Sequence, residues 1–130
     1  MSPWSKIQLG WIEPKEIVKN GMYEIEASAL MPDIYVVSSP FPPNEYLLIE
    51  NRQPLKFDAK LPQGGLIIWH IDGAVSFENS PGYPGQVNWP ENGKHYHVAV
   101  LQADGQYDLE RGEKCYTPIQ IIYLLSSNNY

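Results

Sequence analysis

The stretch GGLIIWHID, residues 64–72, is the strongest fold signal in this chain. A glycine pair opens it, an apolar run follows, and the run ends in His70 and, two residues later, Asp72. A short apolar run that begins at turn residues is typical of a strand buried on both faces. The segment EYLLIENRQ, residues 45–53, has the same character. We therefore expect these two segments to be the central strands of a sheet.

Other segments predict further strands around this pair. Tyr, Ile and Ala alternate with Glu and Ser over residues 23–28, which predicts a half-exposed strand. Short apolar strands are also expected in IYVV (residues 34–37), in HYHVAVLQAD (residues 95–104) and in IQIIYLL (residues 119–125). The segment PFPPN, residues 40–44, predicts a rigid turn.

The N-terminal stretch SPWSKIQLGW predicts a short helix. Ser2 is a suitable N-cap, Pro3 suits the first helical position, and Gly10 suits the exit. Three apolar residues recur at helical spacing and predict a face that docks on a larger partner: Trp4, Ile7 and Trp11.

The composition predicts one mainly β domain over residues 1–130. The 12 prolines and 10 glycines favour turns and short elements, and the 9 tyrosines and 4 tryptophans are typical of strand proteins. Long Pro/Gly-rich loops are expected at residues 54–64 and 73–94. The expected architecture is an antiparallel sheet or sandwich-like domain with a short N-terminal helix.

The charge pattern argues against two classes of partner. The formal net charge is −6, from 15 acidic and 9 basic residues, and no basic cluster is present to neutralise phosphates, so we expect no nucleic acid partner. No apolar run is long enough to span a membrane, which needs about 18 residues, so we expect no membrane partner. The N-terminal stretch also lacks the pattern of an export signal.

Three histidines form one candidate metal site. His95 and His97 are separated by one residue, so in a strand they project from the same face, and His70 could approach from a neighbouring strand. Such a group can bind zinc. The alternative is that these histidines are surface or cross-strand residues satisfied by hydrogen bonds.

A group of carboxylates forms a second candidate metal site. Asp104, Asp108 and Glu110 surround Gly105, and hard oxygen ligands in a turning backbone favour calcium. The alternative is a turn with solvated acids. The single cysteine, Cys115, cannot form a disulfide within the chain and has no visible neighbouring base.

Two polar pairs at strand ends predict structural roles. Glu50 and Arg52 follow an apolar segment, where they form a paired charge that closes a sheet edge or orients a loop. His70 and Asp72 end the opening stretch, and we expect them to hold the adjacent long loop by hydrogen bonds.

Four stretches resemble one family in the same order: SPWSKIQLGW, EYLLIENRQPLKFDAKLPQGGLIIWHID, GYPGQVNWPENGKHYHVAVLQADG and QYDLERG. Residues 2–112 are similar to the downstream part of the peptidase domain of immune-inhibitor-A-type zinc metallopeptidases, which are secreted and metzincin-related. The resemblance implies an extracellular parent protein. After residue 112 the chain departs from the polar, aspartate-containing pattern of the family. The proposed calcium loop is therefore expected to lack further acidic ligands.

The family's zinc site comes from a helix with the motif H-E-x-x-H, and no His-Glu pair occurs in this chain. None of the family's catalytic residues can therefore be carried over. The resemblance predicts a non-catalytic C-terminal subdomain that scaffolds an upstream catalytic half. Two alternatives stay open: a self-assembling or protein-binding β-domain, and a small domain that binds calcium or zinc.

Overall fold

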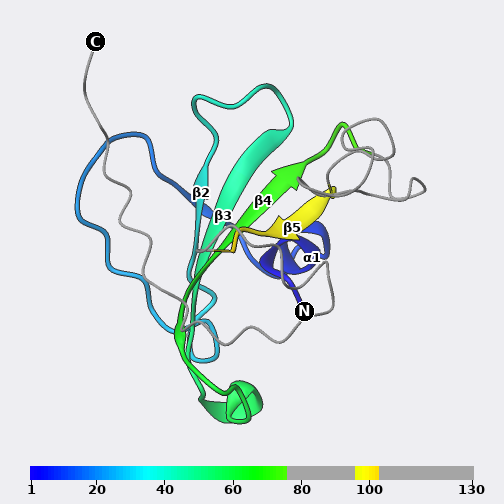
Figure 1. Ribbon diagram of the computed structural model, residues 1–130. Helices are drawn as coiled ribbons and strands as arrows, with labels where there is room; N and C mark the ends of the chain where they lie inside the picture. The colour runs from blue at the N-terminus through cyan, green and yellow to red at the C-terminus, as the bar shows by residue number, and fades with distance from the viewer. Residues whose placement is uncertain (76–95, 103–130) are drawn as a thin grey trace.

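The computed structural model describes residues 1–75 and 96–102, which form a five-stranded sheet with a short helix on one face (Figure 1). In chain order the elements are α1 (Pro3–Gln8), β1 (Lys15–Glu16), β2 (Ile34–Val37), β3 (Glu45–Arg52), the 3-10 helix η1 (Lys56–Asp58), β4 (Gly65–Asp72) and β5 (Val98–Val100). The prediction of a mainly β fold with a short N-terminal helix is confirmed.

The strands lie in the sheet in the order in which they occur in the chain. β1 runs parallel to β2, and the other three pairs are antiparallel. The sheet is therefore mixed rather than purely antiparallel. The segment between β1 and β2 leads back to the end of the sheet at which β1 begins, so the two strands run in the same direction. Within the described ranges, the layer that packs on the sheet is α1 and not a second sheet.

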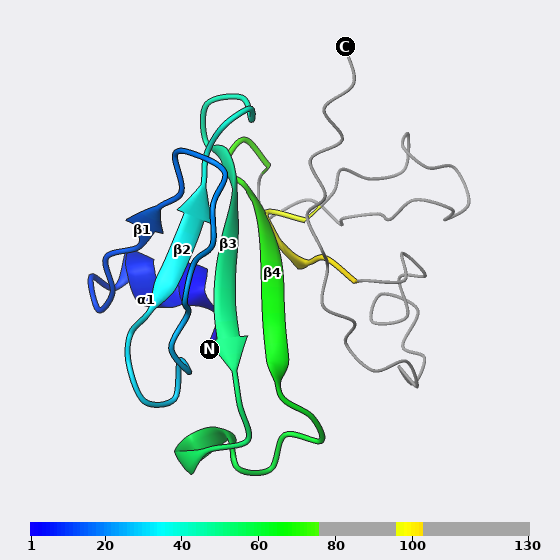
Figure 2. The same ribbon diagram turned by 90° about the vertical axis from the view of Figure 1, so that its left-hand side faces the viewer.

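The hairpin of β3 and β4 forms the middle of the sheet, as the sequence predicts. Both strands are eight residues long and pair along their whole length, from Glu45 opposite Asp72 to Arg52 opposite Gly65. The connection of residues 53–64 extends beyond the rest of the sheet and contains η1 (Figure 2). At the other end, the backbone N–H of Gly73 donates to the carbonyl of Asn44 at 2.8 Å and closes the corner.

Helix α1 begins and ends where its sequence signals indicate. The Ser2 side chain accepts a hydrogen bond from the backbone N–H of Ser5 at 3.2 Å, and Pro3 occupies the first turn. Gly10 has a φ of +70°, a left-handed conformation that suits glycine and turns the chain away from the helix axis. The helix prediction is confirmed.

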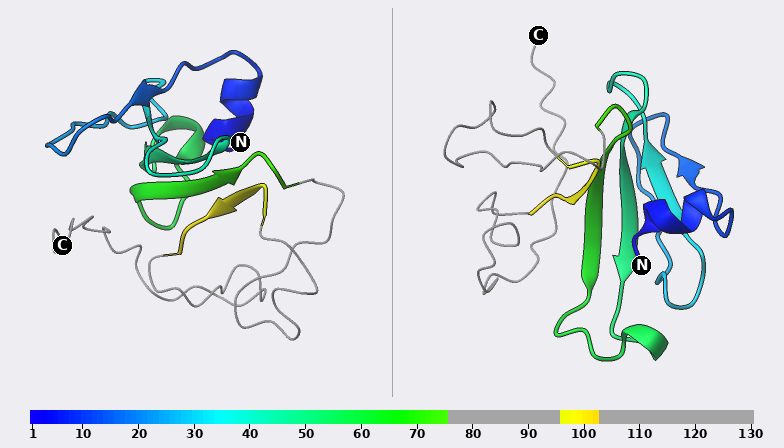
Figure 3. Two further views of the ribbon diagram at one scale, coloured as in Figure 1. Left: turned by 90° about the horizontal axis from the view of Figure 1, so that it is seen from above. Right: turned by 90° about the vertical axis from the view of Figure 1, so that its right-hand side faces the viewer.

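The core lies between α1 and one face of the sheet (Figure 3). Ile34, Leu48 and Ile71, one from each of three adjacent strands, are almost completely buried. Seven partly buried apolar residues pack around them: Trp4, Ile7, Ile12, Val36, Tyr46, Trp69 and Val98. Strand alternation places the inward residues of neighbouring strands side by side, so a short helix suffices to cover them.

The predicted strand at residues 23–28 is wrong. Its alternating pattern is present, but the only ladder contact of this segment within the described chain is an isolated bridge between Ala27 and Asn51. The position beside β2 is taken instead by the two-residue strand β1. Polar side chains hold the segment: Tyr35 Oη donates to the carbonyl of Glu24 at 3.1 Å, and Asn51 Nδ2 donates to that of Ile25 at 2.9 Å.

Three other sequence predictions fall partly or wholly outside the described residues. The strand expected at residues 95–104 is present in its middle as β5, which is only three residues long. The loop expected at residues 73–94 is described only as far as residue 75. The strand expected at residues 119–125 lies outside the described residues. No helix in the described part of the chain is long and apolar enough to cross a membrane.

Candidate functional site

A carboxylate lies fully buried on the central strand β3. Glu50 follows Leu48 by two residues, so it faces the same side of the sheet as the apolar core, and it has an exposed fraction of 0%. Its Oε1 accepts a hydrogen bond from Trp69 Nε1 at 3.0 Å and lies 3.3 Å from Arg52 Nε. Its Oε2 has no hydrogen-bond partner among the described residues. We call Glu50, Arg52 and Trp69 the buried carboxylate cluster.

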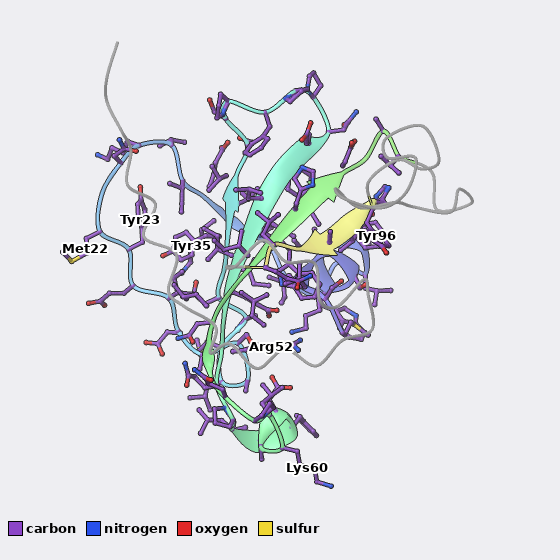
Figure 4. The ribbon with its side chains drawn as sticks, viewed as in Figure 1. Met22, Tyr23, Tyr35, Arg52, Lys60 and Tyr96 are labelled. Atoms are coloured by element: carbon purple, nitrogen blue, oxygen red, sulfur yellow. The ribbon has the colours of Figure 1, made fainter. Side chains whose placement is uncertain are left out.

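Arg52 connects this cluster to two other parts of the chain. Its Nη2 donates to the carbonyl of Met1 at 2.8 Å, and its Nε lies 3.9 Å from an oxygen of Asp58 in η1. Figure 4 shows Arg52 between the hairpin and the N-terminal segment. The guanidinium therefore joins the sheet, the start of the helical segment and the hairpin connection. Arg52, the last residue of β3, thus orients the connection that follows this strand. Glu50 lies on a central strand of the sheet and not on one of its outer strands.

The histidine on the central hairpin pairs across the two strands. His70 Nε2 lies 2.8 Å from an oxygen of Glu45, and the His70 ring is tilted against the ring of Phe41 at 6.3 Å between centroids. Asp72 Oδ1 accepts a hydrogen bond from the backbone N–H of Ala74 at 2.9 Å, just after β4 ends. Asp72 thus holds the first residues that follow the strand, whereas His70 contacts β3.

The second described histidine contacts the helix. His97 Nδ1 donates to the carbonyl of Val75 at 2.6 Å, and its ring meets the Trp4 ring edge-on at 5.2 Å between centroids. Among residues 1–75 and 96–102, no three His, Cys, Asp or Glu side chains gather to hold a metal ion. His95 lies outside the described residues, so the zinc site as a whole stays a prediction.

The predicted calcium ligands Asp104, Asp108 and Glu110, together with Cys115, lie outside the described residues. The calcium site therefore also stays a prediction.

The predicted docking face on the N-terminal stretch divides into two parts. Trp4 and Ile7 pack against the core of this chain's own sheet. Trp11 lies beyond the end of α1, after the turn at Gly10, and its exposed fraction is 64%. The spacing of the three residues predicts one common face, but the left-handed turn at Gly10 separates Trp11 from the other two.

An ion pair that the sequence did not indicate anchors β1 to β2. Asp33, directly before β2, has an exposed fraction of 6%. Its Oδ1 lies 2.6 Å from Lys15 Nζ, and its Oδ2 accepts a hydrogen bond from the backbone N–H of Glu26 at 2.9 Å. Burial acts to raise the pKa of the Asp33 carboxyl, but the hydrogen bonds from Lys15 and Glu26 outweigh it and hold the pKa below its ordinary value.

Lys15 also lies over the Tyr35 ring at 5.4 Å, so the Lys15–Asp33 pair fixes the edge of the sheet. The only sign of this ion pair in the sequence is an aspartate just before a predicted strand. That position does not identify Lys15, 18 residues earlier, as the partner.

No protein family, curated protein or solved structure matches this chain. The resemblance to zinc metallopeptidases therefore remains a prediction from the residues.

Proposed function

We propose that this chain is a non-catalytic β-domain that acts as a scaffold by binding another polypeptide. The partner that the sequence resemblance favours is the catalytic half of a zinc metallopeptidase. The chain has no H-E-x-x-H motif, so a hydrolytic zinc site of that type would come from the partner.

Trp11 is the observation that carries this proposal. Its large side chain is mostly exposed, whereas Trp4 and Ile7 of the same segment pack against the core of the sheet. Tryptophan contributes more than most residues to protein–protein interfaces, because it buries a large apolar area and orders few rotatable bonds. A partner can therefore bind the Trp11 side chain without disturbing the packing of this chain's core.

The test combines an activity assay with a binding assay. The purified chain with added zinc should cleave no casein. The tagged chain, isolated from its native source, should co-purify in a fixed ratio with a polypeptide that carries H-E-x-x-H. Trp11→Asp should weaken that association at least tenfold, which corresponds to about 1.4 kcal/mol.

Phe57→Asp is the matched control, because it places the same charge at an exposed aromatic position on another surface. It should leave the association with the catalytic polypeptide unchanged. Zinc-dependent cleavage by the pure chain would refute the non-catalytic role. An association that Trp11→Asp does not weaken would refute the role of this surface.

A further inference from the structure

The end of the central hairpin presents an apolar side chain entirely to solvent. We call residues 55–61 the hairpin tip. Phe57 in this tip is fully exposed, and Leu55 two residues before it is also exposed. The tip lies at the far end of the hairpin, away from β1 and β2 (Figure 2). An exposed aromatic residue at a projecting position is a frequent anchor in protein contacts.

The backbone of the hairpin tip is ordered by its own hydrogen bonds. The N–H of Asp58 donates to the carbonyl of Leu55 at 2.9 Å, and that of Leu61 donates to the carbonyl of Asp58 at 2.9 Å. Lys56 has a φ of +50°, a left-handed conformation that is unusual for a residue with a side chain. A tip that is already ordered loses little conformational entropy when it binds.

A second exposed apolar surface lies on the connection between β1 and β2. We call residues 17–26 the receiving loop. Met22 has an exposed fraction of 98% and Val18 one of 78%. Figure 4 shows Met22 pointing away from the sheet, at a different end of the molecule from Lys60 of the hairpin tip. One copy of the chain therefore cannot bring its own two surfaces together.

The receiving loop is also held in place. Tyr23 Oη donates to the carbonyl of Lys19 at 2.7 Å within the loop. The Tyr23 and Tyr35 rings meet edge-on at 5.6 Å between centroids, which fixes the loop to β2. Its apolar side chains are thus exposed on an ordered backbone rather than on a free segment.

The two surfaces carry complementary charge. Lys56 and Lys60 are exposed on the hairpin tip, and the acid between them, Asp58, lies near Arg52. The receiving loop exposes Glu24 and Glu26 at one end and Lys19 nearer the other. The formal charge of the hairpin tip is +1 (two lysines and one aspartate) and that of the receiving loop is −1 (one lysine and two glutamates), so the two surfaces attract each other locally although the copies have the same net charge.

We propose that the hairpin tip of one copy docks on the receiving loop of a second copy, with Phe57 against Met22 and Val18 and the two lysines facing Glu24 and Glu26. Because the two surfaces differ, the contact is heterologous, and each added copy presents a new tip and a new loop. The contact does not use Trp11, so it is independent of the scaffold function proposed above.

The test uses two blocked variants and their mixture. Wild-type protein should show a mass in sedimentation equilibrium that rises with concentration, at about 0.15 M salt, where repulsion between net charges is screened. Phe57→Asp, with a blocked tip, and Met22→Asp, with a blocked loop, should each be monomeric. Their equimolar mixture should form a one-to-one dimer and nothing larger, because one variant keeps its loop and the other its tip.

Controls separate this contact from misfolding and from the scaffold function. Both substituted side chains are fully exposed, so the thermal unfolding midpoints should match that of the wild type at a dilution where the wild type is monomeric. Trp11→Asp should associate as the wild type does. Lys56→Glu with Lys60→Glu should also block self-association. Adding a partner with Glu24→Lys and Glu26→Lys should restore an association whose mass rises with concentration, because each tip then meets a loop of opposite charge on the other variant.

Three outcomes would overturn the proposal. The first is a wild-type protein that stays monomeric up to about 1 mM, the weak end of measurable association. The second is a mixture of the blocked variants that stays monomeric while the wild type associates. The third is a monomer whose Phe57 instead mediates binding to vesicles of phosphatidylserine, which would identify an anionic membrane as the occupant.

Discussion

Glu50 occupies a position where an apolar residue would be expected. It is fully buried on the central strand, and its neighbours on that face of the sheet form the apolar core. A buried carboxylate is costly unless it is paired, and here Trp69 and Arg52 both contact Oε1. The same arginine holds Met1 and approaches Asp58, so the buried carboxylate cluster orders two connections as well as one strand.

Arg52→Met should destabilise the protein by about 3 kcal/mol, because it leaves the Glu50 carboxylate buried without its counter-charge. The double variant Glu50→Leu with Arg52→Met should be more stable than Arg52→Met alone, since it removes the uncompensated charge. Urea unfolding followed by tryptophan fluorescence measures both differences. The control, Lys60→Met at the exposed hairpin tip, should stay within about 0.5 kcal/mol of wild type. An Arg52→Met variant as stable as wild type would contradict the pairing.

At the scale of the elements, the packing of the N-terminal segment on the sheet depends on one of its two tryptophans. Trp4→Ala should destabilise the protein by about 2–4 kcal/mol, because Trp4 packs against the sheet and touches His97. Trp11→Ala should change the free energy of unfolding by less than about 0.5 kcal/mol, because Trp11 is mostly in solvent. Chemical unfolding of the two variants compares them directly. Equal losses would contradict the division of the predicted docking face.

The elements that the sequence predicts well are those with strong local signals. The helix at Pro3–Gln8 has a cap, a proline and an exit glycine, and the central strands are long apolar runs between turn residues. The segment at residues 23–28 has an equally clear alternation and is not a strand. This segment is held by hydrogen bonds from the side chains of Tyr35 and Asn51 rather than by a strand ladder, and a local alternation does not reveal such tertiary contacts. The two residues of β1, which do pair with β2, give no sequence signal.

For the molecule as a whole, the buried Asp33 predicts a dependence of stability on pH. In the unfolded chain its carboxyl has an ordinary pKa of 3.8, and in the fold the Lys15 and Glu26 contacts hold the pKa below that value. A depressed folded pKa contributes stability that is complete above the unfolded pKa and is lost as pH falls towards the folded one.

Wild-type protein should therefore lose stability more steeply than Asp33→Asn as the pH falls below about 4. The difference in free energy of unfolding between the two should be largest near neutral pH and should shrink in acid. Urea unfolding at a series of pH values measures this difference. A difference that stays constant from neutral pH into acid would contradict the ion pair.

The sequence by itself determined the short helix, the strands expected at residues 34–37, 45–53 and 65–72, and the mainly β class, because these follow from local periodicity and capping. It also located Glu50, Arg52, His70 and Asp72 at strand ends. Only the tertiary structure decided the partners of these residues, the parallel strand β1, and the separation of Trp11 from Trp4 and Ile7. Such contacts join residues far apart in the chain, and a local pattern carries no information about which distant group meets it.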